Sequence, residues 1–309
     1  MQQISLTKGE TTMMNKETFA NNVLNVIKEK LGDYYKVTLQ PITKNNGLNL
    51  LGLVIQKHNN SICPQIYLDG YYNHFIQGRN FDEIIEDILD TYSDSMMNTD
   101  VSLEWINDKE AFLSKVAFKL INRDMNLEML ENIPYEPVVG DLVKVFYLVV
   151  SMNGDGGTIL VHNGLIERIG ISLEELSASA TKNTPVLLPV EMMRIETALA
   201  QMMDSSEDEF PMCTNVGMHI ITNQRKVFGA AVLCYEGLMT EVCNKLGGSI
   251  YIIPSSTHEI IVLRADNSDD VEYLTNMIRE VNETQVALEE RLSDHLYYYD
   301  AISQTLSVA

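Results

Sequence analysis

Residues 218–264 read MHIITNQRKVFGAAVLCYEGLMTEVCNKLGGSIYIIPSSTHEIIVLR, and this stretch decides the fold class. Its short apolar runs, separated by turn residues, are typical of strands, and one amphipathic run is typical of a helix. The pattern predicts strands at 218–222, 229–235, 249–253 and 259–264, with helices at 238–246 and 269–281. This order, two strands and a helix (ββα) repeated, predicts an antiparallel sheet with packed helices, which is an α+β fold.

Upstream of this stretch, strand signals again precede helix signals. The apolar residues of 142–162 are interrupted by Asn153-Gly154-Asp155-Gly156-Gly157, whose composition predicts a hairpin turn. A phosphate-binding glycine loop would lead into a helix instead of a strand. Helices are expected at 172–182, where Ser172 provides an N-cap, and at 190–203.

The N-terminal half carries its own helix and strand signals. The pattern predicts helices at 15–31 and 81–94, strands at 36–41, 48–56 and 62–68, and a short helix near Leu127. Pro134 and Pro137 indicate a domain boundary. We therefore expect a disordered extension at 1–14, an N-terminal α+β module at 15–133 and a C-terminal α+β module at 134–309, with mixed or antiparallel sheets.

The composition restricts the class of partner. The 309 residues include 22 Lys and Arg against 43 Asp and Glu, for a formal net charge of -21. Such a chain repels phosphate backbones and anionic lipids, so we expect no direct binding to nucleic acid or to a membrane. No apolar run approaches the roughly 18 residues of a membrane helix, and the N-terminus lacks the apolar core of a secretion signal. These features predict a soluble, cytoplasmic protein.

The cysteines show neither zinc-ligand spacing nor a redox motif. They are Cys63, Cys213, Cys234 and Cys243, and they lie in apolar or mixed surroundings. We expect reduced thiols in the core, and we expect no metal site and no cofactor.

The segment 81–94 has the clearest amphipathic pattern. Its apolar residues fall on one helical face, and Asp82, Glu83, Glu86, Asp87, Asp90 and Asp94 occupy the other. The spacing predicts a negative surface patch centred on Asp82, Glu83, Glu86, Asp87 and Asp90, above buried isoleucines. Such a face is usually only solvated, but it is also the candidate surface for a basic partner or for imitation of DNA phosphates.

The segment Pro254-Ser255-Ser256-Thr257-His258-Glu259 most resembles a catalytic site. Ser255, Ser256, His258 and Glu259 supply hydroxyl, imidazole and carboxylate groups, which are the parts of a nucleophile and a general base. No HExxH or GxSxG pattern accompanies them. We favour the alternative that these side chains hydrogen-bond within a turn between two strands.

A tyrosine run near the C-terminus is a second candidate surface. A strand at Tyr297-Tyr298-Tyr299 would place Tyr297 and Tyr299 on one face and Tyr298 on the other. Tyr297 and Tyr299 could therefore either pack within the sheet, with their hydroxyls anchored, or contribute to a binding surface.

Several strings of sequence form a distinctive set. They are PQIYL (64–68), TILVHN (158–163), LLP (187–189), IIPSS (252–256), VNETQV (281–286), LSD (292–294) and YYYD (297–300). The set resembles a bacterial family of unknown function, encoded in gut bacteria and often within mobile genetic elements. The resemblance spans roughly 14–300 and implies no activity; the family's proteins usually begin near Met14, so the preceding residues depart from the pattern.

Two functional hypotheses follow. The lack of catalytic motifs and the net charge favour an acidic interaction or regulatory protein whose partner is another protein, such as a basic or nucleic-acid-binding host factor. A mobile-element setting would fit a counter-defence role. The alternative is a hydrolase-like enzyme that uses Ser255, Ser256, His258 and Glu259. A solvent-connected cleft beside this turn, containing His162, Asn163 or His219, would favour the enzyme.

Overall fold

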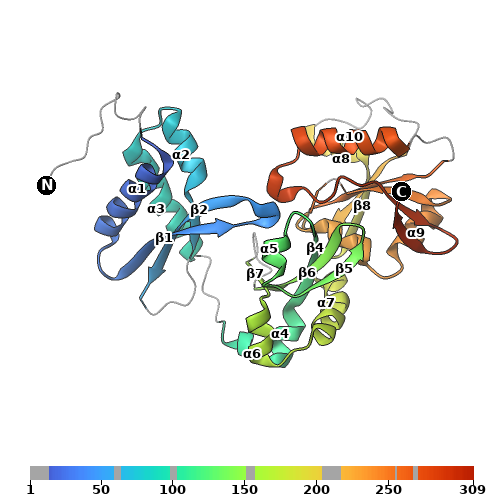
Figure 1. The fold of residues 1–309 in the computed structure, drawn as a ribbon, viewed down its shortest axis with the longest axis horizontal. Helices are drawn as coiled ribbons and strands as arrows, with labels where there is room; N and C mark the ends of the chain where they lie inside the picture. The colour runs from blue at the N-terminus through green and yellow to red at the C-terminus, as the bar shows by residue number, and fades with distance from the viewer. Residues whose placement is uncertain are drawn as a thin grey trace. The chain divides into compact units, whose positions relative to one another are not determined.

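The computed structural model describes residues 14–58, 64–97, 103–150, 157–203, 217–254, 256–266 and 271–309. The chain divides into two compact units, unit 1 at Met1–Ser102 and unit 2 at Leu103–Ala309 (Figure 1). Both units combine helices with antiparallel sheets, which confirms the predicted α+β class. The expected extension at 1–14 lies outside the described residues except for Met14, and no described helix is long and apolar enough to cross a membrane.

Unit 1 joins three helices to a three-stranded antiparallel sheet, here called sheet A, with the strand order β1-β2-β3. Its elements are α1 (Lys16–Leu31), β1 (Tyr35–Thr43), β2 (Asn49–Lys57), β3 (Gln65–Tyr67), α2 (Leu68–Ile76) and α3 (Phe81–Met97). Asn15 caps α1 by accepting a hydrogen bond from the Thr18 N–H. One core holds these elements together, with Phe19 of α1, Leu53 of β2 and Ile84 of α3 all excluded from solvent.

The first sheet of unit 2, sheet B, is built around one long central strand. Its strands are β4 (Val116–Asn122), β5 (Tyr135–Val139), β6 (Leu142–Val149) and β7 (Thr158–Leu160), and β6 pairs with the other three. The accompanying helices are η3 (Glu104–Asn107), α4 (Lys109–Lys115), α5 (Leu127–Leu130), α6 (Asn163–Ile169) and α7 (Leu173–Leu187). A complete capping box, formed by Ser172 and Glu175, begins α7.

The pairing of β4 with β6 shows that the domain boundary lies earlier in the chain than Pro134 and Pro137 suggest. The register runs from Val116 opposite Leu148 to Asn122 opposite Leu142, so strands from both sides of Pro134 belong to one sheet. The boundary expected between 133 and 134 therefore falls inside unit 2, and the division of the chain lies between 102 and 103. Pro134 directly precedes β5 and Pro137 lies within it, so the prolines do not mark a linker.

Sheet C of unit 2 has the strand order β13-β12-β10-β11-β9-β8. These strands are β8 (Val190–Arg194), β9 (His219–Asn223), β10 (Ile250–Ile253), β11 (Ile260–Arg264), β12 (Tyr297–Asp300) and β13 (Thr305–Val308). The accompanying helices are α8 (Ile195–Met203), η5 (Gly229–Cys234), α9 (Leu238–Leu246), α10 (Val271–Thr284) and η6 (Leu288–Glu290), of which α10 lies across the sheet in Figure 1.

Two predicted elements of the C-terminal half are wrong. Where a strand is expected at 229–235, residues 229–234 form the 3₁₀ helix η5, and 190–194 form the strand β8 instead of the start of a helix. The predicted ββα-ββα order is therefore β9-η5-α9 followed by β10-β11-α10. A short, continuous apolar run does not distinguish a buried helix from a buried strand, which explains the error at η5.

Gly229 explains why η5 can lie deep in unit 2. A Cβ atom at this position would lie 2.1 Å from the His258 carbonyl oxygen and 2.1 Å from Thr222 Oγ1. The close approach brings η5 into the main core, where Val232 packs with Phe118 of sheet B and Ile252 of sheet C. Unit 2 is therefore one body with a core shared by two sheets.

Candidate functional site

The turn at 254–259, between β10 and β11, is held by three other segments. The Thr257 N–H donates to the Glu290 carbonyl oxygen of η6 at 2.8 Å, and the Ala230 N–H of η5 donates to the Thr257 carbonyl oxygen at 3.2 Å. Thr222 Oγ1 of β9 donates to the His258 carbonyl oxygen at 2.7 Å. Ser256 and Thr257 are buried as a result.

The hydroxyl of Ser256 is used inside the turn. It donates to Glu259 Oε1 at 2.7 Å and accepts from the His258 backbone N–H at 3.0 Å. In a Ser-His-Asp triad the hydroxyl proton is directed at an imidazole, and here it is directed at the carboxylate of Glu259, so Ser256 and His258 do not form the nucleophile and base of such a triad. Ser255, the other candidate nucleophile, lies outside the described residues.

The imidazole of His258 is engaged on its face and at both ring nitrogens. Nδ1 accepts a hydrogen bond from the Phe228 backbone N–H at 3.3 Å, so the ring proton of the neutral form lies on Nε2. Nε2 lies 3.6 Å from Glu290 Oε1, and the ring stacks on Phe228 with centroids 6.0 Å apart. These contacts are those of a side chain that fixes a turn against its neighbours.

The other two histidines considered with this turn make local contacts or lie in solvent. His219 Nδ1 lies 2.8 Å from the Gly217 carbonyl oxygen, and His162 is exposed at the start of α6. Within the described part of the chain, no group of three or more His, Cys, Asp and Glu side chains could hold a metal ion.

A buried polar network connects sheets B and C around Asp141, which lies between β5 and β6. Its carboxylate accepts hydrogen bonds from Asn122 Nδ2 at 2.7 Å, from Ser293 Oγ at 2.8 Å and from the Tyr297 hydroxyl. His295 Nδ1 lies 3.4 Å from the same carboxylate. Burial and the neighbouring carboxylate raise the pKa of Tyr297 well above its usual range. The network cross-links residues far apart in sequence, and it explains why Tyr297 is completely buried.

The three consecutive tyrosines of β12 lie in different surroundings. Tyr297 is buried, and the Tyr299 hydroxyl is hydrogen-bonded to Thr240 Oγ1 of α9 at 2.9 Å. Tyr297 therefore packs within the sheet, as one of the two alternatives expects, whereas Tyr299 is partly exposed with its hydroxyl anchored. Tyr298 points to the opposite face and lines a pocket together with Tyr251 and Arg264. The alternation of the strand was the signal that could have identified it.

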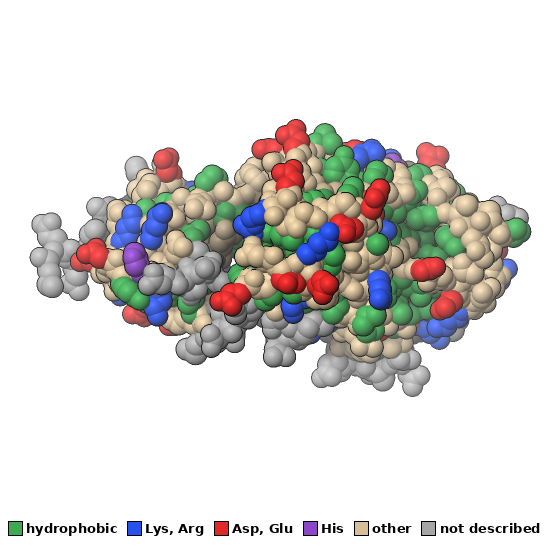
Figure 2. Space-filling model, turned by 90° about the horizontal axis from the view of Figure 1, so that it is seen from below, with side chains coloured by type: hydrophobic (Ala, Val, Ile, Leu, Met, Phe, Trp, Pro, Cys, Tyr) green, Lys and Arg blue, Asp and Glu red, His purple; other side chains and the backbone are tan. Residues whose placement is uncertain are grey.

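The acidic face of α3 is arranged as the helical spacing predicts. Ile84, Ile85 and Ile88 are buried, which confirms that prediction, and the carboxylates lie on the solvent side. Arg79 neutralises part of the patch, since its guanidinium lies 2.6 Å from Asp87 and 3.8 Å from Glu83. On the molecular face shown in Figure 2, acidic side chains are scattered among basic and apolar ones.

The cysteines that the structure describes are unpaired. Cys243 is buried, and Cys234 packs against the main core, where burial raises the pKa of its thiol to about 11. Cys63 and Cys213 lie outside the described residues.

Comparison with known proteins gives one match. The family model DUF5688, described as a family of unknown function, matches residues 16–301. No curated protein and no solved structure matches the chain.

Proposed function

This chain belongs to the DUF5688 family of unknown function, and we propose that it is a non-catalytic interaction protein that binds a basic partner protein through α3 of unit 1. The observation that carries this proposal is a line of three exposed carboxylates, Asp82, Glu86 and Asp90, here called the acidic row. They are spaced four residues apart, so they follow one another along the helix surface.

The acidic row differs from the acids beside it. Glu83 and Asp87 share Arg79, whereas no ion pair within the described residues involves Asp82, Glu86 or Asp90. Like charges at a spacing of four residues destabilise a helix by a few tenths of a kcal/mol per pair. Cations from a partner would remove this repulsion, so the row is better suited to a complex than to the free protein.

A protein that binds basic surfaces could also act as a regulator, because binding alone can block its partner. A protein that covers the basic surface of a nucleic-acid-binding host factor would block that factor without any catalytic step, which is how a counter-defence protein could work. We infer a cytoplasmic location, and the absence of a disulfide at Cys234 and Cys243 fits it.

A pair of triple variants tests the proposal. The variant Asp82→Asn/Glu86→Gln/Asp90→Asn removes the row, and Glu272→Gln/Glu280→Gln/Glu283→Gln removes three exposed carboxylates from α10 as a matched control. Basic proteins captured from a cell lysate should fall about tenfold with the first variant and stay unchanged with the control. Capture should also weaken as salt rises. Equal capture by both variants would contradict the role of the row.

Imitation of DNA is a separate outcome of the same experiment. If the partner binds the acidic row through its own DNA site, duplex DNA added as a competitor should displace it. A partner that stays bound in the presence of DNA uses a different basic surface.

A further inference from the structure

Lys119 of β4 and Tyr147 of β6 carry two polar groups on one face of sheet B. Lys119 lies opposite Val145 in the register of these strands. Tyr147, the next residue but one after Val145, lies opposite Ala117. The two side chains are therefore diagonal neighbours on the same face, a separation that a long side chain and an aromatic ring can span. They belong to unit 2, so they are independent of the acidic row of unit 1.

The ring of Phe228, which directly precedes η5, packs against both side chains. Lys119 Nζ lies 4.2 Å from the centroid of this ring, and the ring centroids of Tyr147 and Phe228 are 5.3 Å apart. The amine and the tyrosine therefore contact the same side chain. His258 stacks on Phe228 with centroids 6.0 Å apart, so the Phe228 ring is fixed before anything binds.

Neither polar group has a hydrogen-bond or ion-pair partner among the residues that the structure describes. This holds for Lys119 Nζ and for the Tyr147 hydroxyl, although only 3% of Tyr147 is exposed. Buried polar groups in proteins are nearly always hydrogen-bonded, and a buried ammonium is normally paired with an acid. Packing alone does not explain an amine and a phenol left unpaired beside each other, and the pair indicates a site that another molecule completes.

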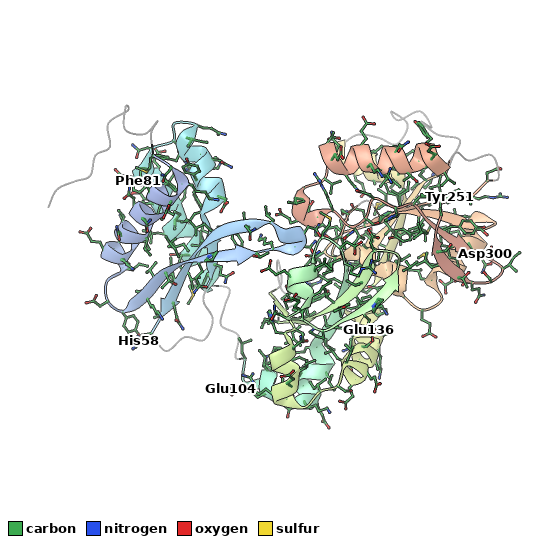
Figure 3. All side chains as sticks on the ribbon, viewed as in Figure 1. His58, Phe81, Glu104, Glu136, Tyr251 and Asp300 are labelled. Atoms are coloured by element: carbon green, nitrogen blue, oxygen red, sulfur yellow. The ribbon has the colours of Figure 1, made fainter. Side chains whose placement is uncertain are left out.

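The surroundings of Lys119 favour the neutral amine. Glu136 of β5, labelled in Figure 3, is the one acidic residue within the described strands of sheet B. It lies opposite Lys144 and hence on the other face of the sheet. On the face of Lys119, Ala117 and Val145 are fully excluded from solvent. Burial accordingly lowers the pKa of Lys119 from 10.5 to about 8.

A neutral lysine amine is a nucleophile toward carbonyl carbon. When it adds to an aldehyde, the C–N bond forms, the π electrons of the carbonyl move to oxygen, oxygen takes up a proton and nitrogen loses one. Loss of water from this carbinolamine gives an imine, so amine and aldehyde become imine and water. Burial raises the pKa of Tyr147 well above its usual range, so its phenol stays protonated. Tyr147 can therefore donate the proton to oxygen and recover the one released from nitrogen.

We propose that Lys119 is a reversible covalent binding site for a small aromatic aldehyde, which is held as an imine with its ring against Phe228 and Tyr147. Lys119 is partly exposed, so a small molecule can reach the amine. The two rings select an aromatic substituent, because aromatic pairs attract each other beyond the burial of their surface. Imine formation releases only water and needs no further reactant, so it gives unit 2 a ligand without making the protein an enzyme.

The probe for this proposal is benzaldehyde, used with sodium cyanoborohydride, which reduces an imine to a stable secondary amine and so marks the lysine that formed it. Peptide mass spectrometry of the full chain then gives the labelling rate of each lysine. At neutral pH, Lys119 should be labelled about tenfold faster than Lys182, an exposed lysine of α7. The rate at Lys119 should rise with pH and level off above about pH 8. Labelling no faster at Lys119 than at Lys182 would overturn the proposal, whether or not the acidic row binds a partner.

Two variants separate the roles of the amine and the phenol. Lys119→Met removes the nucleophile, so the fast labelling should disappear. Tyr147→Phe keeps the ring and removes the hydroxyl, so labelling at Lys119 should slow by roughly tenfold. Tyr273→Phe, at an exposed tyrosine of α10, is the control and should leave the rate unchanged. Unchanged labelling in Tyr147→Phe would contradict the role of its hydroxyl.

A second aldehyde tests the aromatic selectivity. Glyceraldehyde is small and polar, so the preference for Lys119 over Lys182 should be lost when it replaces benzaldehyde. An equal preference with both aldehydes would contradict the role of the rings of Phe228 and Tyr147. Circular dichroism shows whether each variant is folded; should Tyr147→Phe unfold, the comparison of Lys119 with Lys182 in the wild type still decides.

Discussion

At the scale of single residues, the segment before η5 shows how unit 2 supports an unfavourable backbone. Lys226 and Phe228 have positive φ angles of 55° and 53°, which are uncommon for residues other than glycine. Asn223 supports the segment by donating to the Val227 carbonyl oxygen at 2.8 Å and accepting from the Arg225 N–H at 3.0 Å. His258 adds the hydrogen bond to Phe228. Strain of this kind persists only where neighbouring contacts fix the chain.

Replacing His258 tests whether its role is structural. His258→Ala removes the acceptor for the Phe228 N–H and the ring stacked on Phe228, so it should lower the stability of the protein by about 1–3 kcal/mol. Urea titration measures the loss. His258→Asn, which can supply an acceptor oxygen at a similar position, should recover part of it. If the alanine variant is as stable as the wild type and the purified protein contains a metal ion, His258 belongs to a catalytic or metal site and its role is not structural.

The buried ammonium group of Lys119 leads to a second prediction at the scale of single residues. Its Nζ lies 4.2 Å from the centroid of the Phe228 ring, and burial lowers the pKa of its ammonium from 10.5 to about 8. The unfolded chain therefore binds more protons than the folded one between pH 8 and 10.5. The sign follows from linkage: the stability contributed by this group rises with pH across that window.

The measurement compares Lys119→Met with the wild type from pH 7.5 to pH 10. The difference in unfolding free energy, wild type minus variant, should increase by roughly 2 kcal/mol. The comparison uses a difference because burial also raises the pKa of Cys234, Tyr147 and Tyr235. The contribution of these three groups to the free energy of unfolding falls as the pH rises, and it cancels in the difference. Lys182→Met, at an exposed position of α7, should show no such change. A flat difference for Lys119→Met would mean that its ammonium is not desolvated.

At the scale of an element, α3 combines a well-packed face with a repulsive one. Glu86→Lys places a cation between Asp82 and Asp90 and turns two repulsive pairs into attractive ones. Unit 1 should gain about 1 kcal/mol of stability, visible as a higher melting temperature, and Glu86→Gln should give about half of that gain. The gain should shrink as salt rises. If the acidic row binds a basic partner, the stabilised lysine variant should also bind it less tightly. A lysine variant that is less stable than wild type would contradict the arrangement of the row.

At the scale of the whole molecule, the core of unit 1 and the main core of unit 2 share no residue. The unit 1 cluster lies within 14–96, and the main cluster of unit 2 contains only residues from 105 onward. Each unit therefore has a hydrophobic core of its own, which is the physical requirement for independent folding.

Truncation distinguishes the structural boundary from the one suggested by the prolines. A fragment of residues 103–309 should fold and unfold cooperatively. A fragment of 134–309 should not, because it lacks β4, leaves β6 without its long partner strand and removes Phe118 and Leu120 from the core. Circular dichroism and thermal melting of the two fragments provide the measurement. A stable fragment of 134–309 would show that β4 is dispensable.

The sequence by itself determined the features that depend on local spacing. The face of α3 that carries Ile84 and Ile88, the N-caps Asn15 and Ser172, and the hairpin of β1 and β2 all follow from residues close together in the chain. Helical periodicity, caps and turn chemistry act over a few residues, so they can be predicted without the rest of the molecule.

Only the tertiary structure decided the features that join distant segments. Residues 229–234 have the composition of a strand, but Gly229 must fit against Thr222 and His258, and the buried site so formed accepts a 3₁₀ helix. Asp141 and Tyr297 are 156 positions apart, so no local spacing could indicate their hydrogen bond. The pocket likewise depends on which strand lies beside which, since Tyr251 and Tyr298 meet only through the pairing of β10 with β12. Contacts between distant segments depend on packing of the whole unit, and periodicity in the sequence carries no record of it.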